Sequence, residues 1–293
     1  MKLKSVIARV VSKVSPNLYF RLSYFKNRKR FLSLKHPKDI SEILISKVVN
    51  GEIDKVAYLA DKYEVRKFIE EKGYIHILTK LLGCYTTPDQ IDFNQLPDRF
   101  AIKMNYGAGM NIICSDINNF DKQDACRKLN NWLTRNSYSN AERHYNLIPR
   151  KIIIEEFIDD GNGGFPTDYK FMCIRGKVFC ILGCSHRESE HASYSPYDTN
   201  WQIIAGYDKL NRSYASITKP KNLQDMIKIA EDLSKDFDVI RVDLFSDGNR
   251  IWFGEMTLTP AGCILHGWSQ KALDDMGKAY RKGWISREIE FED

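Results

Sequence analysis

The stretch that decides the fold lies near the C-terminal end of the chain and reads RVDLFSDGNRIWFGEMTLTPAG, residues 241–262. Residues 239–245 and 250–256 are rich in β-branched and aromatic types, and an Asp-Gly-Asn turn separates them, which predicts a β-hairpin. Asp243 and Glu255 lie at similar offsets from this turn. We therefore expect the two carboxylates to lie on neighbouring strands and to share one face of the sheet.

A carboxylate pair of this kind suits Mg²⁺, which usually takes one or two carboxylates together with phosphate oxygens of a nucleotide. Asp243 and Glu255 also stand among apolar neighbours, where an unpaired charge would be costly. Arg241 lies two residues before Asp243 on the same strand face and would suit negative charge on a transferred phosphoryl group. The alternative is that both acids simply face solvent on an alternating strand.

A second candidate feature is Lys103, at the end of the β-like run RFAIKM (99–104) and directly before a turn that holds Asn105, Gly107 and Gly109. Bare backbone N–H groups in such a loop can approach an anion closely, so lysine and loop together would form a triphosphate cradle. The pattern GxxxxGK[ST] is absent, so this is not a Walker loop. The alternative is an ordinary hairpin.

A third feature is the buried strand KIIIEEF (151–157), which ends in carboxylates before a glycine-containing loop. Glu155, Glu156, Phe157 and Ile158 would offer backbone groups to an adenine base and a carboxylate to sugar hydroxyls. The alternative is a solvated strand end.

The rest of the chain predicts a mixed α+β body. Apolar periodicity predicts helices at 39–50 and 54–72, each followed by a glycine, and further helices at 121–136 and 220–235. Residues 168–185 predict another hairpin. Residues 74–98 are expected to be a loop and 185–220 an irregular polar stretch. Since there is no βαβ repeat and no GxGxxG after a strand, a Rossmann fold is not supported.

Composition excludes several classes of protein. With 293 residues, 43% hydrophobic and 28% charged, the chain is long enough for about two folded domains, and intrinsic disorder is excluded. No run reaches the ~18 apolar residues of a membrane span. The seven cysteines are scattered and odd in number, which is typical of reduced, cytoplasmic proteins.

The N-terminal segment is strongly basic. Residues 1–32 hold nine lysines and arginines and no acid, although the whole chain carries only +6, so the remainder is net acidic. Apolar residues from Leu3 to Val14 follow one face of a helix, and cations occupy the other. We expect residues 1–32 to associate with an anionic membrane surface, the alternative being that the stripe packs on the protein itself. The aromatics follow helical spacing and the body is acidic, so no nucleic-acid partner is expected.

These features occur in an order that resembles the ATP-grasp enzymes. The order is DK (Asp61-Lys62), Lys103 with its glycine loop, the EEF segment, DYK (168–170), RVD (241–243) and GEMTLTPAG (254–262). More closely, the strings ADKYEVRKFIEEKG, LPDRFAIKMNYGAGMNIIC and DYKFMCIRGKV are similar to the TupA-like ATP-grasp family of bacterial polysaccharide and teichuronopeptide biosynthesis. The resemblance covers roughly residues 36–263.

The resemblance implies an ATP-grasp fold, in which two α+β subdomains clasp ATP and a helical basic N-terminal region precedes them. The implied domains are a basic amphipathic arm (1–35), a helical region (36–96) and an ATP-grasp catalytic core (97–293).

The resemblance also implies roles for individual residues. Arg241 and Lys170 would be catalytic, and Thr257 stands where broader ATP-grasp ligases have an asparagine that completes the metal shell. Arg66 and Arg187 would contact substrate. The implied nucleotide-binding residues are Lys62, Lys103, Asn105, Gly107, Gly109, Glu155, Glu156, Phe157 and Ile158, and the implied metal ligands are Asp243, Glu255 and Thr257.

The implied activity is an ADP-forming carboxylate–amine ligase that uses ATP and Mg²⁺. It would join an amino acid to a uronic-acid or peptide carboxylate of a small-molecule, glycan or nucleotide-sugar acceptor. An ATP-grasp kinase acting on a sugar, or a glycosyltransferase of the same pathway, are the alternatives. We expect a cytoplasmic protein, peripheral at the inner membrane face.

Overall fold

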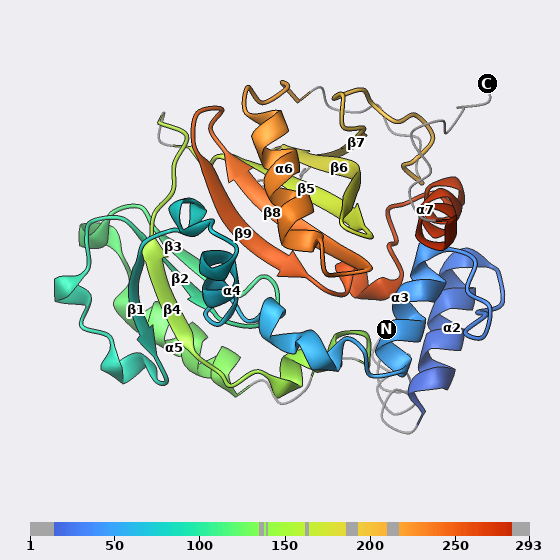
Figure 1. Ribbon diagram of the computed structural model, residues 1–293. Helices are drawn as coiled ribbons and strands as arrows, with labels where there is room; N and C mark the ends of the chain where they lie inside the picture. The colour runs from blue at the N-terminus through green and yellow to red at the C-terminus, as the bar shows by residue number, and fades with distance from the viewer. Residues whose placement is uncertain are drawn as a thin grey trace.

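The computed structural model describes residues 15–134, 138, 140–161, 164–185, 193–209 and 217–282. Two antiparallel β-sheets, one of four strands and one of five, lie side by side (Figure 1). Helices α2 (Pro16–Arg28), α3 (Ile40–Val49) and α7 (Gln270–Lys282) lie at the end of the molecule away from the four-stranded sheet. The helical stripe expected from Leu3 to Val14 lies outside the described residues. No helix in the described part of the chain is long and apolar enough to cross a membrane.

The four-stranded sheet has the order β1-β4-β2-β3, with every neighbouring pair antiparallel. The predicted strands at 99–104 and 151–157 are present as β2 and β4. The loop expected at 74–98 is wrong in part, because Leu81–Tyr85 pair with β4 and complete this sheet. The strands are β1 (Leu81–Tyr85), β2 (Phe100–Met104), β3 (Asn111–Cys114) and β4 (Ile152–Glu156).

The five-stranded sheet has the order β7-β6-β5-β8-β9. Both predicted hairpins are confirmed as β5–β6 and β8–β9. The irregular stretch expected at 185–220 contains the edge strand β7, which only its pairing with β6 reveals. The strands are β5 (Thr167–Ile174), β6 (Lys177–Ser185), β7 (Ser193–Tyr197), β8 (Val239–Ser246) and β9 (Ile251–Thr257).

The two faces of the five-stranded sheet differ in chemistry. On one face, Phe171, Val242 and Leu244 are buried, and helix α6 (Leu223–Ser234) packs against β5, β6 and β8 on its apolar side. The opposite face carries the charged residues of the predicted site, because their positions alternate with these apolar ones.

The predicted helix at 54–72 is wrong as a single element. The structure has a 3₁₀ helix η1 (Asp54–Ala60), a break, and then helix α4 (Val65–Glu71). At the break, Asp61 accepts hydrogen bonds from the backbone N–H groups of Tyr63 (2.8 Å) and Glu64 (3.3 Å). Local side chain to backbone bonds of this kind compete with a continuous helix, and they turn the chain where Lys62 stands.

The remaining elements surround the sheets. Gly51 follows α3 with a φ of 74°, the left-handed conformation in which glycine is favoured at a helix end. The helices are α2 (Pro16–Arg28), α3 (Ile40–Val49), α5 (Lys122–Leu133) and α7 (Gln270–Lys282), and the short 3₁₀ segments are η2 (Ile75–Ile77), η3 (Pro88–Gln90), η4 (Phe93–Gln95), η5 (Ile117–Asn119), η6 (Asn140–Leu147) and η7 (Pro260–Cys263).

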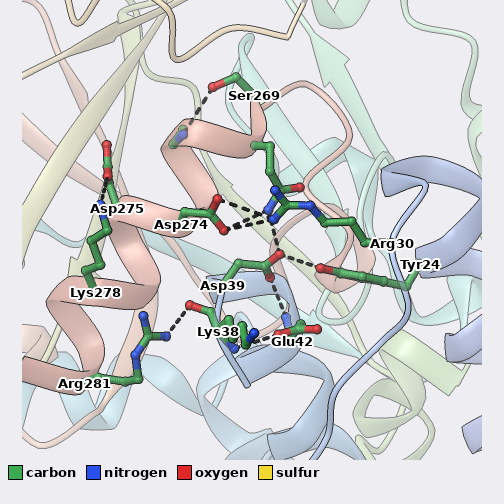
Figure 2. A network of polar contacts seen from close by, with 12 residues as sticks. Tyr24, Arg30, Lys38, Asp39, Glu42, Ser269, Asp274, Asp275, Lys278 and Arg281 are labelled. Atoms are coloured by element: carbon green, nitrogen blue, oxygen red, sulfur yellow. Dashed lines mark hydrogen bonds and ion pairs between the residues drawn. The ribbon is translucent and has the colours of Figure 1, made fainter. Parts of the chain in front are cut away.

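The described half of the basic arm packs on the body through a polar network (Figure 2). The Tyr24 hydroxyl of α2 donates to Asp39 at 2.6 Å, and Gln270 of α7 donates to the same carboxylate at 2.9 Å. At Gly277 a side chain would collide with the backbone carbonyl of Lys38, so α7 approaches this segment closely. Residues 15–32 therefore do not form a free arm.

Candidate active site

The charged face of the five-stranded sheet brings the predicted catalytic and metal residues together. Asp243 and Glu255 lie directly opposite each other on β8 and β9. Arg241 holds both: its Nε and Nη2 atoms lie 2.6 and 2.7 Å from the two Asp243 oxygens, and Nη2 lies 3.0 Å from Glu255 Oε1. The two carboxylates share one face as expected, but they do so because a β-bulge between Asp243 and Leu244 shifts the register that the turn sets.

Lys170 adds a second cation to the same row. It stands opposite Asp243 on β5, and its Nζ lies 2.7 Å from carboxylate oxygens of both Asp243 and Asp168. Burial by itself would raise the pKa of Asp243, but Arg241 and Lys170 outweigh burial and lower it to about 2. Asp243 is therefore an anion at neutral pH although only 2% of its surface is exposed.

Two of the residues present, Asp243 and Glu255, fit a divalent cation. Asp243 and Glu255 offer hard oxygen donors on adjacent strands, and Mg²⁺ commonly takes two carboxylates with phosphate and water. The described residues contain no group of three or more His, Cys, Asp and Glu side chains that could hold a metal. Thr257 donates its hydroxyl to Glu255 at 2.9 Å, so in the structure it orients a carboxylate.

On the four-stranded sheet, the partly buried Lys103 belongs to an ion-pair cluster around the buried carboxylate of Glu155. Its Nζ lies 2.7 Å from Glu155 Oε2, and Arg66 Nη1 lies 3.0 Å from Glu155 Oε1. Arg66 also donates to the Thr79 carbonyl at 2.7 Å. Burial would raise the pKa of Glu155, yet Lys103 and Arg66 hold it below its ordinary 4.5. Glu155 thus positions the lysine, and Arg66 is paired within this cluster.

Glu155→Gln is expected to lower the free energy of unfolding by about 3 kcal/mol at pH 7, because it leaves two cations without their buried anion. The folded pKa lies below the unfolded value, so the stabilising effect is present above pH 4.5 and is lost as pH falls through the folded pKa. Urea unfolding of both proteins at several pH values measures it. A gap between wild type and variant that widens on acidification would contradict this prediction.

Lys62 reaches the glycine loop from the break after η1. Its Nζ lies 2.8 Å from the carbonyl oxygen of Gly107, and its backbone N–H donates to the Asn105 carbonyl at 2.7 Å. The Asn105 side chain is fully buried, donates to the Pro149 carbonyl at 2.9 Å and accepts from the Lys151 N–H at 2.8 Å. Asn105 therefore anchors the base of the loop.

The loop itself depends on glycine. Gly107 and Gly109 have φ values of 69° and 72°, which side chains rarely adopt. At Gly107 an added carbon would also collide with the Tyr138 hydroxyl.

The predicted adenine-binding segment, residues 155–158, begins with the last two residues of β4 and continues just beyond it. Arg250, from the turn of the β8–β9 hairpin, lies 3.6 Å from Glu156. The Arg99 guanidinium carbon Cζ lies 3.9 Å from the centroid of the Phe157 ring. The Phe157 and Ile158 side chains are half-buried. This segment thus lies where the two sheets connect.

The pKa of Lys62 depends on charged groups from both sheets. Burial lowers the pKa of the Lys62 ammonium and Lys103 lowers it further, while Glu255 and Glu155 oppose both. Glu255 also contributes to the raised pKa of Tyr145, after burial, which is the main cause. Lys62, between η1 and α4, therefore lies within electrostatic range of Glu255 on one sheet and of Lys103 and Glu155 on the other.

Some residues of this site were not singled out from the sequence. Asp168 belongs to the quoted DYK string but was not assigned a role, and Tyr145 has no local signal. The predicted substrate residue Arg187 lies outside the described residues.

The two antiparallel sheets with their surrounding helices form an ATP-grasp fold. The chain belongs to the TupA-like ATP-grasp family, whose model matches residues 42–280. The match confirms the predicted family, the α+β ATP-grasp fold and the class of ATP-grasp ligases.

Similar solved structures include D-alanine–D-alanine ligase from Bacillus anthracis (16% identity, 79% of this chain and 70% of that chain covered, TM-score 0.45). They also include an L-amino acid ligase from Bacillus licheniformis (12% identity, 85% and 56% covered, TM-score 0.48). A third is the ATP-grasp ligase PsnB in complex with a minimal precursor (13% identity, 83% and 68% covered, TM-score 0.42). No curated relative matches the chain.

Proposed function

We propose that this protein is an ADP-forming carboxylate–amine ligase that joins an amino acid to a uronic-acid or peptide carboxylate during bacterial surface polysaccharide biosynthesis. The observation that carries the proposal is the group of ion pairs in which Arg241 contacts both Asp243 and Glu255, and Lys170 contacts Asp243. Glu255 also acts electrostatically on Lys62. The family match supports the ligase class, and the pathway and the substrates belong to the proposal.

The proposed reaction has two steps. A carboxylate oxygen of the acceptor attacks the γ-phosphorus of ATP, which forms an acyl phosphate and releases ADP. The amine nitrogen then attacks the acyl carbon, the C–O bond to phosphate breaks, and an amide, inorganic phosphate and a proton result. No covalent intermediate with a protein side chain is needed.

The residues divide this work by charge. Lys62 and Lys103 bind the phosphates, and the loop with Gly107 and Gly109 covers them. Asp243 and Glu255 would hold Mg²⁺, which would neutralise part of the triphosphate charge. Arg241 orients both carboxylates and places a permanent cation beside the transferred phosphoryl group. The segment Glu156 to Ile158 binds the adenine base of ATP.

Lys170 helps to neutralise the buried carboxylate of Asp243. Its ammonium and the Arg241 guanidinium neutralise Asp243 in the structure, so the carboxylate does not depend on metal for its burial. We assign Lys170, together with Arg241, to the phosphoryl group that leaves ATP.

The test is ADP and phosphate release with a panel of amino acids and uronosyl or peptide acceptors, followed by mass analysis of the acceptor. A gain of one amino acid minus water supports the ligase. A gain of phosphate supports the sugar kinase instead, and transfer of a sugar would support the glycosyltransferase.

Lys103→Ala is expected to weaken ATP binding by about tenfold or more, because a direct cation–phosphate contact is removed. Calorimetric titration with a non-hydrolysable ATP analogue and Mg²⁺ measures the affinity. The matched control is Lys67→Ala on the exposed surface of α4, where Lys67 Nζ lies 3.8 Å from Glu71. Unchanged affinity in Lys103→Ala would remove this lysine from the phosphate site.

We also infer that residues 1–32 associate with the anionic inner face of the cytoplasmic membrane. The supporting observation is the basic charge of the segment, with nine cations and no acid. A glycan precursor carried by a lipid would then meet the enzyme by a two-dimensional search.

A further inference from the structure

Helix α2 carries apolar residues on two sides. Phe20 and Tyr24 on one side are buried against the body. Leu18, Leu22 and Phe25 on the other side are 46%, 55% and 45% exposed. Their spacing of four and three residues places these three on one stripe of the helix.

Phe31 extends this stripe just beyond the helix. It is 87% exposed, the largest value among the exposed large hydrophobic side chains of the described residues. Its ring stacks on Phe25, with centroids 5.4 Å apart and an angle of 30° between the planes. The two rings form a joint aromatic tip that is left in water, although burying it would be favourable.

Cations flank the stripe on both sides. Arg21, Lys26 and Lys29 are exposed, and the first acidic residue of the whole chain is Asp39. We define the α2 face by its apolar and basic members: Leu18, Leu22, Phe25, Phe31, Arg21, Lys26 and Lys29.

The chemistry of this face selects its occupant. Two copies meeting through the α2 face would place like charges opposite each other, which opposes a symmetric dimer. An anionic bilayer complements both parts of the α2 face. Phe and Leu side chains can be buried at the boundary between headgroups and acyl chains, and Arg and Lys can contact the lipid phosphates. Figure 1 places α2 at the outer edge of the molecule, with α3 between it and the sheets.

We propose that the α2 face docks on an anionic lipid bilayer, with Phe25 and Phe31 inserted at the boundary between headgroups and acyl chains. This deepens the membrane association proposed above for residues 1–32 by assigning the contact to the α2 face, and it rests on the proposed ligase function only for the acceptor. The docking element is a folded helix of the body, distinct from the stripe at residues 3–14.

Arg28 connects this face to the catalytic strand. On the buried side of α2 its guanidinium donates to the carbonyls of Ile264, Leu265 and Trp268 at 2.6–2.8 Å. That loop follows β9 and its terminal residue Thr257. Docking of α2 would hold the loop after β9 close to the bilayer, which suits an acceptor carried on a lipid anchor.

The test compares full-length protein and variants by co-sedimentation with vesicles. Leu22→Gln/Phe25→Gln/Phe31→Gln removes the apolar stripe, keeps every charge and uses a good helix former. We expect binding to phosphatidylglycerol-containing vesicles to fall at least about tenfold. We expect wild type to bind phosphatidylcholine vesicles weakly.

The matched control is Ile75→Gln/Leu147→Gln, which removes two side chains that are 63% and 59% exposed on other parts of the surface. We expect it to bind like wild type. Thermal unfolding checks that the variants stay folded.

Other outcomes overturn the proposal. A triple variant that binds as wild type does would show that the α2 face is not the docking surface, and equal binding to both vesicle types would exclude the charge complementarity. If wild type is a dimer by light scattering and the triple variant a monomer with unchanged vesicle binding, the face is an interface between copies. Since the assay has no turnover, failure of the ligase activity leaves its result intact.

Discussion

Asp243→Asn is expected to lower ATP-dependent ADP release by about 100-fold or more while the protein stays folded. The carboxylate is buried between Arg241 and Lys170, at 2.6–2.7 Å from their nitrogens, and lies opposite Glu255. Asparagine keeps the volume but removes the charge that would hold Mg²⁺ against the phosphates. ADP release measured over a Mg²⁺ titration tests this, and we expect excess Mg²⁺ to restore little activity.

Two further variants make the result specific. Glu255→Gln should show the same loss, because it removes the second proposed metal ligand. Asp236→Asn is the control, since its carboxylate lies on the surface and pairs with Lys72 at 2.6 Å. Surface ion pairs contribute little to the free energy of unfolding, so we expect this variant to behave as wild type does. If Asp243→Asn or Glu255→Gln keeps near-normal Mg²⁺-dependent turnover, the metal assignment is wrong.

Arg28→Met is expected to lower the free energy of unfolding by about 3–5 kcal/mol. The guanidinium is buried and donates three hydrogen bonds to backbone carbonyls of the loop 264–268. Methionine can fill the space of the stem but leaves these carbonyls without their charged donor. Burial also lowers the pKa of Arg28, which reflects the cost of placing this cation inside.

Urea unfolding monitored by circular dichroism measures the loss, with Arg30→Met as the control. Arg30 is exposed and pairs with the surface residue Asp274 at 3.5 Å, so we expect a change in the free energy of unfolding within about 0.5 kcal/mol. Equal destabilisation by the two variants would show that the buried hydrogen bonds of Arg28 are not what secures α2 to the body.

The sequence predicted best where the structure is local. The Asp-Gly-Asn turn locates the β8–β9 hairpin and brings Asp243 and Glu255 onto neighbouring strands, but a β-bulge between Asp243 and Leu244 is what places the two carboxylates directly opposite each other. The strand lysine and the glycine loop were recognised for the same reason, since the loop conformation needs glycine at the positions that the sequence shows. The order of these short motifs also identified the family.

Pairings across long sequence separations were not predictable. Strand β1 has no strong strand signal and exists because β4 offers it an edge. The break between η1 and α4 interrupts a helical pattern because Asp61 bonds to the backbone. Thr257 was expected to be a metal ligand, and only the structure shows that it donates to Glu255.

The sequence by itself thus determined the family and the two hairpins and placed the two carboxylates on neighbouring strands, because short turns and side-chain alternation set these over a few residues. Only the structure shows the β-bulge that puts Asp243 and Glu255 on one face. Only the tertiary structure decided that Arg66 and Lys103 share Glu155, from 89 and 52 residues away. It also decided that α2 buries one apolar side and exposes the other. Burial and ion pairing depend on which distant surfaces pack together, and no local pattern specifies that.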